Sequence, residues 1–339
     1  ELVLHDIAIF KEFYDYDFTE MMEILKAPEF AVILSYEKPS HAGKVYNKRI
    51  RDRICTLARQ FVENRDARAM KATLTQFYQE YGVGNMGLHK AFRVVHTDEG
   101  AQIVPILNIA HVHLDDLVGY EIPKKKLVDN TEAFVAGRRA NNCLLFGDAG
   151  TGKSSCVKAI ANEYYDRGLR IIELYKHQFQ DLNSVISQVK NRNYKFIIYM
   201  DDLSFEDFEI EYKYLKAVIE GGLEKKPANV LIYATSNRRH LIRENYSDKE
   251  DRRTEDMHAG DTVQEKLSLV YRFGVSIFFC APDKKQFQQI VKTLADRNGI
   301  NMEEEELYLE ANKWELAHGG LSGRTAQQFI DYLLGQIKE

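Results

Sequence analysis

Apolar residues recur at helical spacing through the first part of the chain. Between residues 44 and 81 they include Ile50, Ile54, Leu57 and Phe61, which fall on one side of a helix. A glycine-rich stretch at residues 81–87 interrupts this pattern. Residues 91–107 then read as two strands around a turn at residues 98–100, which is typical of a β-hairpin. The pattern predicts a mainly helical N-terminal region with a hairpin.

From about residue 141 the pattern changes to short, continuous apolar runs separated by helical stretches. The runs occupy residues 142–146, 170–175, 195–200, 230–235 and 276–280. Strands of this kind, alternating with helices, indicate a parallel sheet that helices cover on both faces. After Pro282 the pattern is helical only, and residues 245–266 are too polar to bury much, which predicts a surface loop.

These changes divide the chain into three predicted domains. Residues 1–110 form the helical N-terminal region with its hairpin, residues 111–281 an α/β core with five parallel strands, and residues 282–339 a small helical domain. The predicted fold class is therefore α/β, with helical additions at both ends.

Composition narrows the class of protein without identifying it. The net charge of -5 argues against a strongly basic nucleic-acid wrapper, although a local basic patch is compatible with it. The 4 cysteines are far apart and form no CxxC pair, which indicates reduced thiols in a cytoplasmic protein. No apolar stretch approaches the roughly 18–20 residues that a membrane helix needs, so no membrane partner is expected.

The stretch GDAGTGKSS at residues 147–155 carries the clearest chemistry. It matches the pattern G-x-x-x-x-G-K-[ST], which follows a strand and opens a helix in phosphate-binding loops. Glycines let backbone N–H groups surround an anion, and the helix N-terminus adds positive potential. Lys153 is expected to reach the β- and γ-phosphates of a nucleotide, and Ser154 to bind Mg²⁺. The expected nucleotide-binding residues here are Gly147, Asp148, Ala149, Gly150, Thr151, Gly152, Lys153, Ser154 and Ser155.

Two adjacent carboxylates follow the apolar run at residues 195–200. Unpaired at the tip of a strand, Asp201 and Asp202 would repel each other, so a cation is expected there. The Mg²⁺ of a bound nucleotide is that cation, and Asp201 is the predicted second metal ligand beside Ser154. Asp202 would then orient or polarise the attacking water. The alternative is that Asp202 caps a helical turn beginning near Leu203.

The order of these motifs resembles that of the AAA+ ATPases over residues 114–329. The segment LDDLVGYE is similar to the one that contacts adenine, which implies this role for the backbone near Val118 and Gly119. The strand end YATSN resembles sensor 1, a polar side chain that faces the γ-phosphate and the attacking water. The resemblance implies this role for Asn237, with Thr235 as second choice.

Two arginines match further motifs of the same superfamily. The segment LVYRFG resembles the arginine-finger segment, which implies that Arg272 enters the site of a neighbouring subunit. The segment GGLSGRTAQQF resembles the sensor 2 helix of the lid, which implies that Arg324 lies over the phosphates. A cation is disfavoured at a helix N-terminus, so the position of Arg324 itself suggests an anionic partner. Surface charges or salt bridges are the alternatives for both.

A closer resemblance is to an uncharacterised family of predicted AAA+ ATPases, catalogued as a domain of unknown function. It rests on the phrases NTEAF, GTGKSS, DDLSFE and YATSNRRHL, and extends to residues 77–93 in the N-terminal region. This closer resemblance implies ATPase activity and little else. The wider AAA+ resemblance implies a parallel P-loop core, a C-terminal helical lid and a homo-oligomer, as a ring with shared ATP sites.

One feature departs from most AAA+ proteins. Their paired acids are Asp-Glu and the glutamate is the catalytic base, whereas this chain has Asp201-Asp202, with a shorter second side chain. The water could shift, or turnover could be slow, which favours a switch over a fast motor. Glu206 is a less suitable substitute base.

Several weaker patterns keep alternatives open. Arg252 and Arg253 compete with Arg272 for the finger role, and Arg238 and Arg239 could contact a neighbour, a nucleic acid or the strand end. Residues 48–71 are locally basic, as in a nucleic-acid stripe, but a solvated helix face has the same appearance. Residues 111–116 contain two histidines and two aspartates, interpreted as strand-edge polar residues because no matching zinc spacing exists.

The sequence therefore predicts an oligomeric, Mg²⁺-dependent ATPase that remodels or loads an unknown protein or nucleic-acid target. Its expected cofactors are ATP and Mg²⁺, and its expected catalytic residues are Lys153, Asp201, Asp202, Asn237, Arg272 and Arg324. Three alternatives remain: a slow assembly switch acting on nucleic acid, a P-loop kinase of a small acceptor, and a nucleotide-binding module without catalysis.

Overall fold

The computed structural model describes most of the 339-residue chain. The described residues are 1–26, 48–82, 84–98, 100–205, 211–220, 227–237 and 269–336. They form two units, Glu1–Leu88 and His89–Glu339, and each is described separately below. The polar segment at residues 245–266, Glu206, Arg238, Arg239, Arg252 and Arg253 lie outside the described residues.

The first unit is helical, as the apolar spacing predicts. Its described helices are α1 (Leu2–Asp15), α2 (Phe18–Leu25), α4 (Lys48–Glu63), α5 (Ala67–Tyr81) and α6 (Asn85–Leu88). Aspartates begin two of them: Asp17 accepts a hydrogen bond from Thr19 N at 2.9 Å, and Asp66 accepts one from Ala69 N at 2.8 Å. Such caps satisfy N–H groups that have no partner within the helix. Helix α5 packs against α1 and α4.

The second unit is built on a mixed sheet. Its strands are β1 (Ala91–Thr97), β2 (Gly100–Pro105), β3 (Cys143–Gly147), β4 (Leu169–Glu173), β5 (Lys195–Met200), β6 (Val230–Ser236) and β7 (Val275–Phe279). The strand order is β2-β1-β4-β5-β6-β3-β7, and every pair is parallel except β1–β2. The predicted α/β fold class is confirmed. The predicted number of strands is wrong, because the sheet of the described residues has 7 strands rather than five.

The two additional strands are the predicted hairpin, which joins this sheet instead of remaining with the N-terminal region. Strand β1 pairs with β4 through Phe92 and Ile172, both fully buried. Alternation around a turn identifies a hairpin but not its neighbour, which is why the sequence missed this pairing. The predicted domain boundaries at residues 110 and 281 stay predictions.

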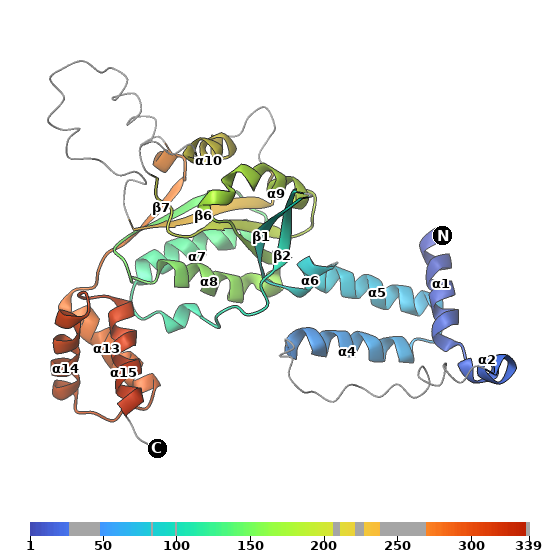
Figure 1. Cartoon of the computed structure of the whole chain (residues 1–339), viewed down its shortest axis with the longest axis horizontal. Helices are drawn as coiled ribbons and strands as arrows, with labels where there is room; N and C mark the ends of the chain where they lie inside the picture. The colour runs from blue at the N-terminus through green and yellow to red at the C-terminus, as the bar shows by residue number, and fades with distance from the viewer. Residues whose placement is uncertain are drawn as a thin grey trace, which may run out of the picture. The chain divides into compact units, whose positions relative to one another are not determined.

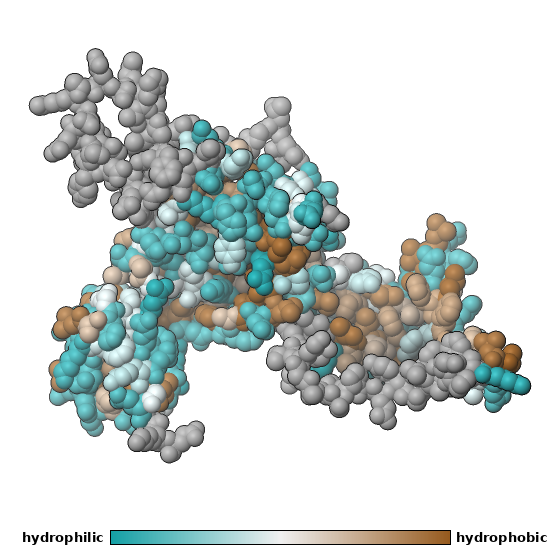
Figure 2. Space-filling view, in the orientation of Figure 1, coloured by the Kyte–Doolittle hydropathy of each residue, from teal (hydrophilic) through white to brown (hydrophobic). Residues whose placement is uncertain are grey.

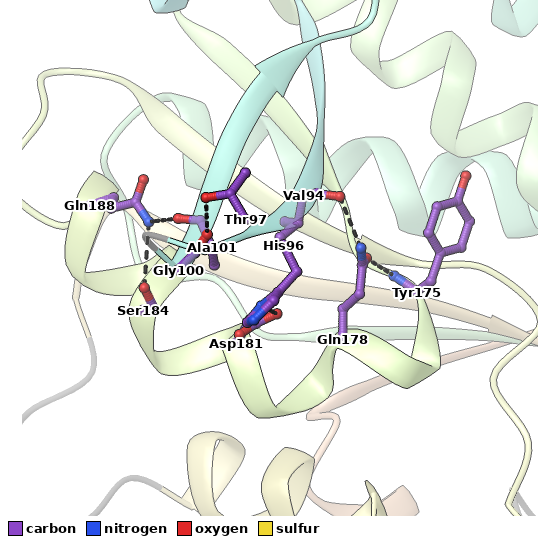
Figure 3. A network of polar contacts seen from close by, with 10 residues as sticks. All are labelled: Val94, His96, Thr97, Gly100, Ala101, Tyr175, Gln178, Asp181, Ser184 and Gln188. Atoms are coloured by element: carbon purple, nitrogen blue, oxygen red, sulfur yellow. Dashed lines mark hydrogen bonds and ion pairs between the residues drawn. The ribbon is translucent and has the colours of Figure 1, made fainter.

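Polar contacts also hold the hairpin to the segment after β4 (Figure 3). Gln178 Nε2 donates to the backbone oxygen of Val94 at 2.9 Å, and Gln188 Nε2 donates to that of Ala101 at 2.8 Å. His96 Nδ1 lies 3.3 Å from Asp181 Oδ2. Each strand of the hairpin is therefore tied to η4 (Lys176–Asp181) or α9 (Leu182–Val189) as well as to the sheet.

Helices cover both faces of the sheet, as the continuous apolar strands predict. Figure 1 shows α7 (Glu121–Val135) and α8 (Lys153–Tyr164) on one face, and α9 and α10 (Glu211–Glu220) on the other. The remaining short helices are η2 (Leu114–Asp116) and η3 (Tyr165–Arg167). Strand β5 is buried along its length except at Lys195, because it is central in the sheet and covered on both faces.

Three helices follow the sheet and form a small domain with its own core, called the lid below. They are α13 (Lys284–Arg297), α14 (Glu304–Ala317) and α15 (Gly323–Gln336), packed around Phe287, Val291 and Phe329. Arg297 donates to the backbone oxygen of Asp115 at 2.7 Å, which connects the lid to η2. Among the described helices, none has the length and apolar character required to cross a membrane.

Candidate functional site

The loop between β3 and α8 contains three glycines with positive φ, at positions of the predicted phosphate-binding pattern. Gly147, which ends β3, has a φ of 131°, and a Cβ there would lie 2.0 Å from the backbone oxygen of Phe279. Gly150 and Gly152 also adopt positive φ, at 76° and 88°. Side chains rarely adopt these conformations, so the three positions need glycine for this path. The sequence pattern is thus explained by local geometry.

Lys153 is enclosed by this loop. Its side chain is buried, and Nζ donates hydrogen bonds to the backbone oxygens of Gly147 at 2.9 Å and Asp148 at 2.6 Å. Burial lowers the pKa of the Lys153 ammonium, and the carboxylates of Asp148 and Asp202 only partly offset that effect. A buried cation that already meets oxygen atoms inside a loop is suited to receive phosphate oxygens.

Asp201 follows β5 and receives two hydroxyl hydrogen bonds. Ser154 Oγ, at the start of α8, donates to Asp201 Oδ1 at 2.7 Å, and Thr235 Oγ1 of β6 donates to the same atom at 2.5 Å. Burial alone would raise the pKa of the Asp201 carboxyl, but the hydrogen bonds from Thr235 and Ser154, with the Tyr199 hydroxyl nearby, outweigh it and lower the pKa. The residue is therefore held as a carboxylate beside the Ser154 hydroxyl.

Asp202 adopts a left-handed backbone conformation, with a φ of 51°. Its N–H donates to Thr235 Oγ1 at 2.9 Å, and its Oδ1 accepts a hydrogen bond from Asn237 Nδ2 at 2.8 Å. Both contacts come from the end of β6, so the side chain is directed toward the predicted sensor residue. The alternative role as a helix cap depends on residues 206–210, which lie outside the described residues.

Thr235, a second choice from the sequence, lies between the two acids. The register explains its place: Met200 of β5 pairs with Ala234 of β6, which brings Asp201 next to Thr235 in parallel strands. One hydroxyl therefore contacts the carboxylate of Asp201 and the backbone of Asp202. Strand register is the signal that could have ranked Thr235 higher, and a single sequence does not provide it.

Sequence reasoning also missed Tyr199. Its side chain is buried on the same side of β5 as Asp201, two residues away. Burial and the nearby Asp201 carboxylate raise the pKa of the Tyr199 hydroxyl above its usual range. The phenol therefore stays neutral and lies close to the Ser154, Asp201 and Thr235 side chains. A tyrosine in an apolar run looks like core, so the sequence offers no signal for this placement.

The lid contacts the loop between β3 and α8. Arg324 N donates to the backbone oxygen of Gly150 at 3.1 Å, and a Cβ on Gly150 would lie 2.8 Å from Ser322 Oγ. The start of α15 therefore approaches the loop so closely that only glycine fits at residue 150. The side chain of Arg324 is exposed to the cavity between the core and the lid.

This cavity has a volume of about 670 Å³ and two ends of different character. The polar end is lined by Lys153, Ser154, Asp201, Asp202, Asn237 and Arg324. The apolar end is lined by Leu117, Val118, Tyr120, Ile290 and Leu294. Gly119, predicted together with Val118, does not line it, and neither do Gly147 and Asp148, whose backbone oxygens meet Lys153 instead. The combination suits a flat, apolar group attached to a polyanion.

Arg272 lies elsewhere in the second unit. It precedes β7, is half-buried between the exposed Tyr271 and the buried Phe273, and does not line the cavity of its own chain. The structure therefore brings five of the six predicted catalytic residues to one cavity and leaves Arg272 outside it.

The polar end offers oxygen ligands suited to Mg²⁺. Mg²⁺ binds one or two carboxylates together with substrate phosphates and water, and does not need a cage of protein ligands. Asp201 and Ser154 match this, since their oxygens lie 2.7 Å apart at the cavity wall. Among the described residues, no group of three or more His, Cys, Asp or Glu is arranged to hold a metal ion. His111 and His113 are among these residues and form no such group.

Known proteins are similar to parts of this chain. A stretch of 66 residues is 38% identical to the replication factor C large subunit of Staphylothermus marinus, and spans 19% of this chain and 15% of that protein. A mutant form of Thermotoga maritima RuvB has a TM-score of 0.46 at 17% identity, with 66% of this chain and 65% of RuvB covered. The AAA domain of FIGL-1 in complex with ADP has a TM-score of 0.45 at 16% identity, with 67% and 74% covered. Both TM-scores are below 0.5, and this chain spans less than two thirds of the replication factor C subunit and of RuvB.

A family model covers most of the chain. It matches residues 87–337, from the end of the first unit through the sheet and the lid. The predicted membership of an uncharacterised family is thereby confirmed. The chain belongs to the family described as "Protein of unknown function (DUF815)".

Proposed function

We propose that this chain is an AAA+ ATPase that binds ATP with Mg²⁺ between core and lid and hydrolyses it. The observation that carries the proposal is the cavity of about 670 Å³, where separate chain segments bring one lysine, two adjacent aspartates, an asparagine and an arginine to the same end. Phosphoryl transfer depends mainly on positioning and electrostatic stabilisation, which such a set supplies.

The phosphates would lie at the polar end. Backbone N–H groups of the loop and the N-terminus of α8 attract an anion, and Lys153 adds a positive charge inside the loop. Arg324 would contribute a second positive charge from the lid. The adenine would then occupy the apolar end, next to Leu117 and Val118 of the core and Ile290 and Leu294 of the lid.

Ser154 and Asp201 are the residues that would hold Mg²⁺. When bound, the metal neutralises charge on the phosphate oxygens. Hydrogen bonds from Ser154 and Thr235 help to keep Asp201 ionised, which suits a metal ligand. Thr235 fixes the orientation of that carboxylate.

Asp202 and Asn237 would orient the attacking water. Asp202 is the proposed base, since its carboxylate faces the cavity beside the phosphate-binding loop. Asn237 holds it at 2.8 Å in this structure, and the same amide would meet water or the γ-phosphate in the reacting complex. Removing either side chain would therefore slow hydrolysis more than it weakens ATP binding.

Arg272 would complete the site of a neighbouring copy, so the active form would be an oligomer, proposed as a ring. Its position outside the cavity of its own chain supports this role. The nucleotide bound at each site would set how the copies are arranged. Changes in that arrangement would remodel or load a protein or nucleic-acid target.

A slow switch that acts on nucleic acid is the second candidate. The Asp202–Asn237 hydrogen bond favours it, because a base held by an amide donor is less available to accept a proton from water. Slow turnover that strengthens salt-sensitive DNA binding would support this candidate over a remodelling enzyme.

The test is ATP turnover per copy against protein concentration, with Arg272→Ala beside the parent and equal mixtures with Lys153→Ala. We expect turnover per copy to rise with concentration in the parent and to stay low in Arg272→Ala. In mixtures, Lys153→Ala supplies an intact Arg272, and Arg272→Ala an intact loop, so activity should partly recover.

Turnover that is independent of concentration and unchanged in Arg272→Ala would contradict the shared site. A monomer that releases ADP only with a small acceptor would indicate a P-loop kinase. Binding of ATP without any turnover would indicate a nucleotide-binding module.

A further inference from the structure

Helix α1 in the first unit carries many large apolar side chains, and only some of them are covered. The covered side carries Ile7, which is 8% exposed, and α1 packs against α5. Large side chains spaced by seven and four residues form two exposed rows, the first across the helix from Ile7 and the second beside it. They are Leu2, Ile9 and Phe13 in one row and Val3, Phe10 and Tyr14 in the next, and are called the α1 outer face below.

The α1 outer face is exposed to an unusual degree. Phe10 is 66% exposed and Phe13 is 69% exposed, and the other four side chains are each more than two-fifths exposed. Figure 2 shows brown, hydrophobic atoms gathered on α1 at the surface of this unit. A surface helix of a globular protein normally keeps its second side polar. Exposure to solvent alone therefore does not account for the large apolar side chains on this face.

The area of the face matches one side of a protein interface. A Phe or Tyr side chain buries about 150–250 Å², so the three partly exposed aromatic residues alone offer roughly 350 Å². With Leu2, Val3 and Ile9, the total reaches on the order of 600–700 Å². Monomers rarely expose apolar patches larger than a few hundred Å². A stable dimer buries about 800 Å² on each partner, which is close to this value.

The charges around the face restrict the kind of partner that can cover it. Acidic residues predominate over residues 1–26, which contain two lysines, Lys11 and Lys26, and one histidine, His5. The acidic residues are Glu1, Asp6, Glu12, Asp15, Asp17, Glu20 and Glu23. Lys11 is bonded to Asp15 at 2.6 Å, which reduces its attraction for an anion. An acidic surface repels nucleic acid and anionic membranes. These charges argue against nucleic acid and anionic membranes, and the large apolar area favours a protein surface that is itself apolar. Asp6 is exposed between the two rows, so a pair of copies must accommodate this carboxylate.

A second copy of the chain supplies such a surface. In a two-fold pair each copy presents the same face, so an apolar face meets an apolar face of equal area. We infer that the α1 outer face is a self-association surface, through which two copies of this chain pair along α1. The pairing is separate from the proposed Arg272 contact and needs no nucleotide.

The test is the mass of the full chain in solution without nucleotide, measured by sedimentation equilibrium across the micromolar range. The variant Phe10→Glu/Phe13→Glu places two charges on the face. The matched control, Leu309→Glu/Leu316→Glu, places two charges at exposed leucines of the lid helix α14. We expect the parent and the control to pair, and the Phe10→Glu/Phe13→Glu variant to stay monomeric, with a dissociation constant at least 100-fold higher.

A milder variant, Leu2→Ser/Ile9→Ser, guards against misfolding, and circular dichroism checks that each variant keeps its helices. It should weaken pairing at least tenfold. A monomeric parent would overturn the inference, and so would pairing that both face variants leave unchanged. A monomeric parent whose α1 resists proteolysis would also overturn it, since the face would then be covered by its own chain. Arg272→Ala should pair like the parent, which separates this inference from the proposed shared ATP site.

Discussion

The hydroxyl of Thr235 donates a hydrogen bond to Asp201 Oδ1 at 2.5 Å, across the ends of two neighbouring strands. Thr235 Oγ1 also accepts a hydrogen bond from the backbone N–H of Asp202 at 2.9 Å. A single buried side chain therefore orients the proposed metal ligand and fixes the left-handed backbone of the proposed base. The two acids are positioned by β6 as much as by their own strand.

Replacing Thr235 by valine should affect both stability and turnover. Valine keeps the shape but leaves the Asp202 N–H and one lone pair of Asp201 without a partner, so the free energy of unfolding should fall by about 1–3 kcal/mol. Turnover should fall at least tenfold, with a higher Mg²⁺ requirement. Thr235→Ser, which keeps the hydroxyl, should restore most of both. Thermal unfolding and Mg²⁺ titrations of turnover measure the effects, and equal behaviour of the two variants would contradict the role of the hydroxyl.

Acid should reduce the stability difference between the parent and Thr235→Val. Hydrogen bonds lower the folded-state pKa of Asp201, so its contribution to stability is fully present above the ordinary carboxyl pKa of about 3.9. That contribution is lost as the pH falls through the folded-state pKa. The difference in unfolding free energy should therefore be largest near neutral pH and shrink in acid. A difference that is constant with pH would show that Asp201 does not contribute.

Asp202→Asn should separate hydrolysis from binding. The amide keeps the size of the side chain but cannot accept a proton from water, so turnover should fall at least 100-fold. ATP affinity should change less than threefold, because Lys153 and the loop remain intact. Asp202→Glu restores a carboxylate and brings it about one C–C bond closer to the cavity. If Asp202 is the base, this variant should retain much more turnover than Asp202→Asn, and equal losses would exclude that role.

Lys153→Ala should remove most of the affinity for ATP. The ammonium is buried within the loop and lies where the phosphates are expected, so its loss should weaken binding at least 100-fold. Arg324→Ala, which removes an exposed cation from the lid side of the cavity, should weaken binding less. Equilibrium titration with a fluorescent ATP analogue measures both. A larger loss in Arg324→Ala would mean that the lid, rather than the loop, holds the phosphates.

Local patterns predicted the parts of this protein that depend on neighbours in sequence. The glycines, Lys153 and Ser154 lie close together in sequence, so their spacing alone predicts the loop and the positive φ of its glycines. The five continuous apolar runs became β3 to β7, since a strand buried on both faces excludes polar residues wherever it lies in the sheet.

The missed features depend on contacts between distant segments. The pairing of β1 with β4 joins residues 91–93 to 171–173, and nothing in the hairpin itself specifies that partner. The place of Thr235 follows from the β5–β6 register, and that of Tyr199 from its alternation with Asp201. The requirement for glycine at residue 150 comes partly from Ser322, far along the chain.

Gly150→Ala should therefore disturb the contact between the loop and the lid. The new Cβ would lie 2.8 Å from Ser322 Oγ and 3.2 Å from the Cβ of Arg324, so α15 must move away from the loop. We expect ATP affinity to fall at least tenfold, since Arg324 would leave the cavity end that Lys153 occupies. Titration with the same fluorescent analogue measures this loss.

Gly168→Ala is the matched control for backbone strain. Gly168 has a φ of 87°, close to the 76° of Gly150, but a Cβ there meets no atom within 4 Å. Both variants should lose about 1–2 kcal/mol of unfolding free energy from the left-handed conformation. Only Gly150→Ala should lose ATP affinity, because only its Cβ meets the lid. Equal affinity in the two variants would show that the approach of Ser322 to the loop is not needed for nucleotide binding.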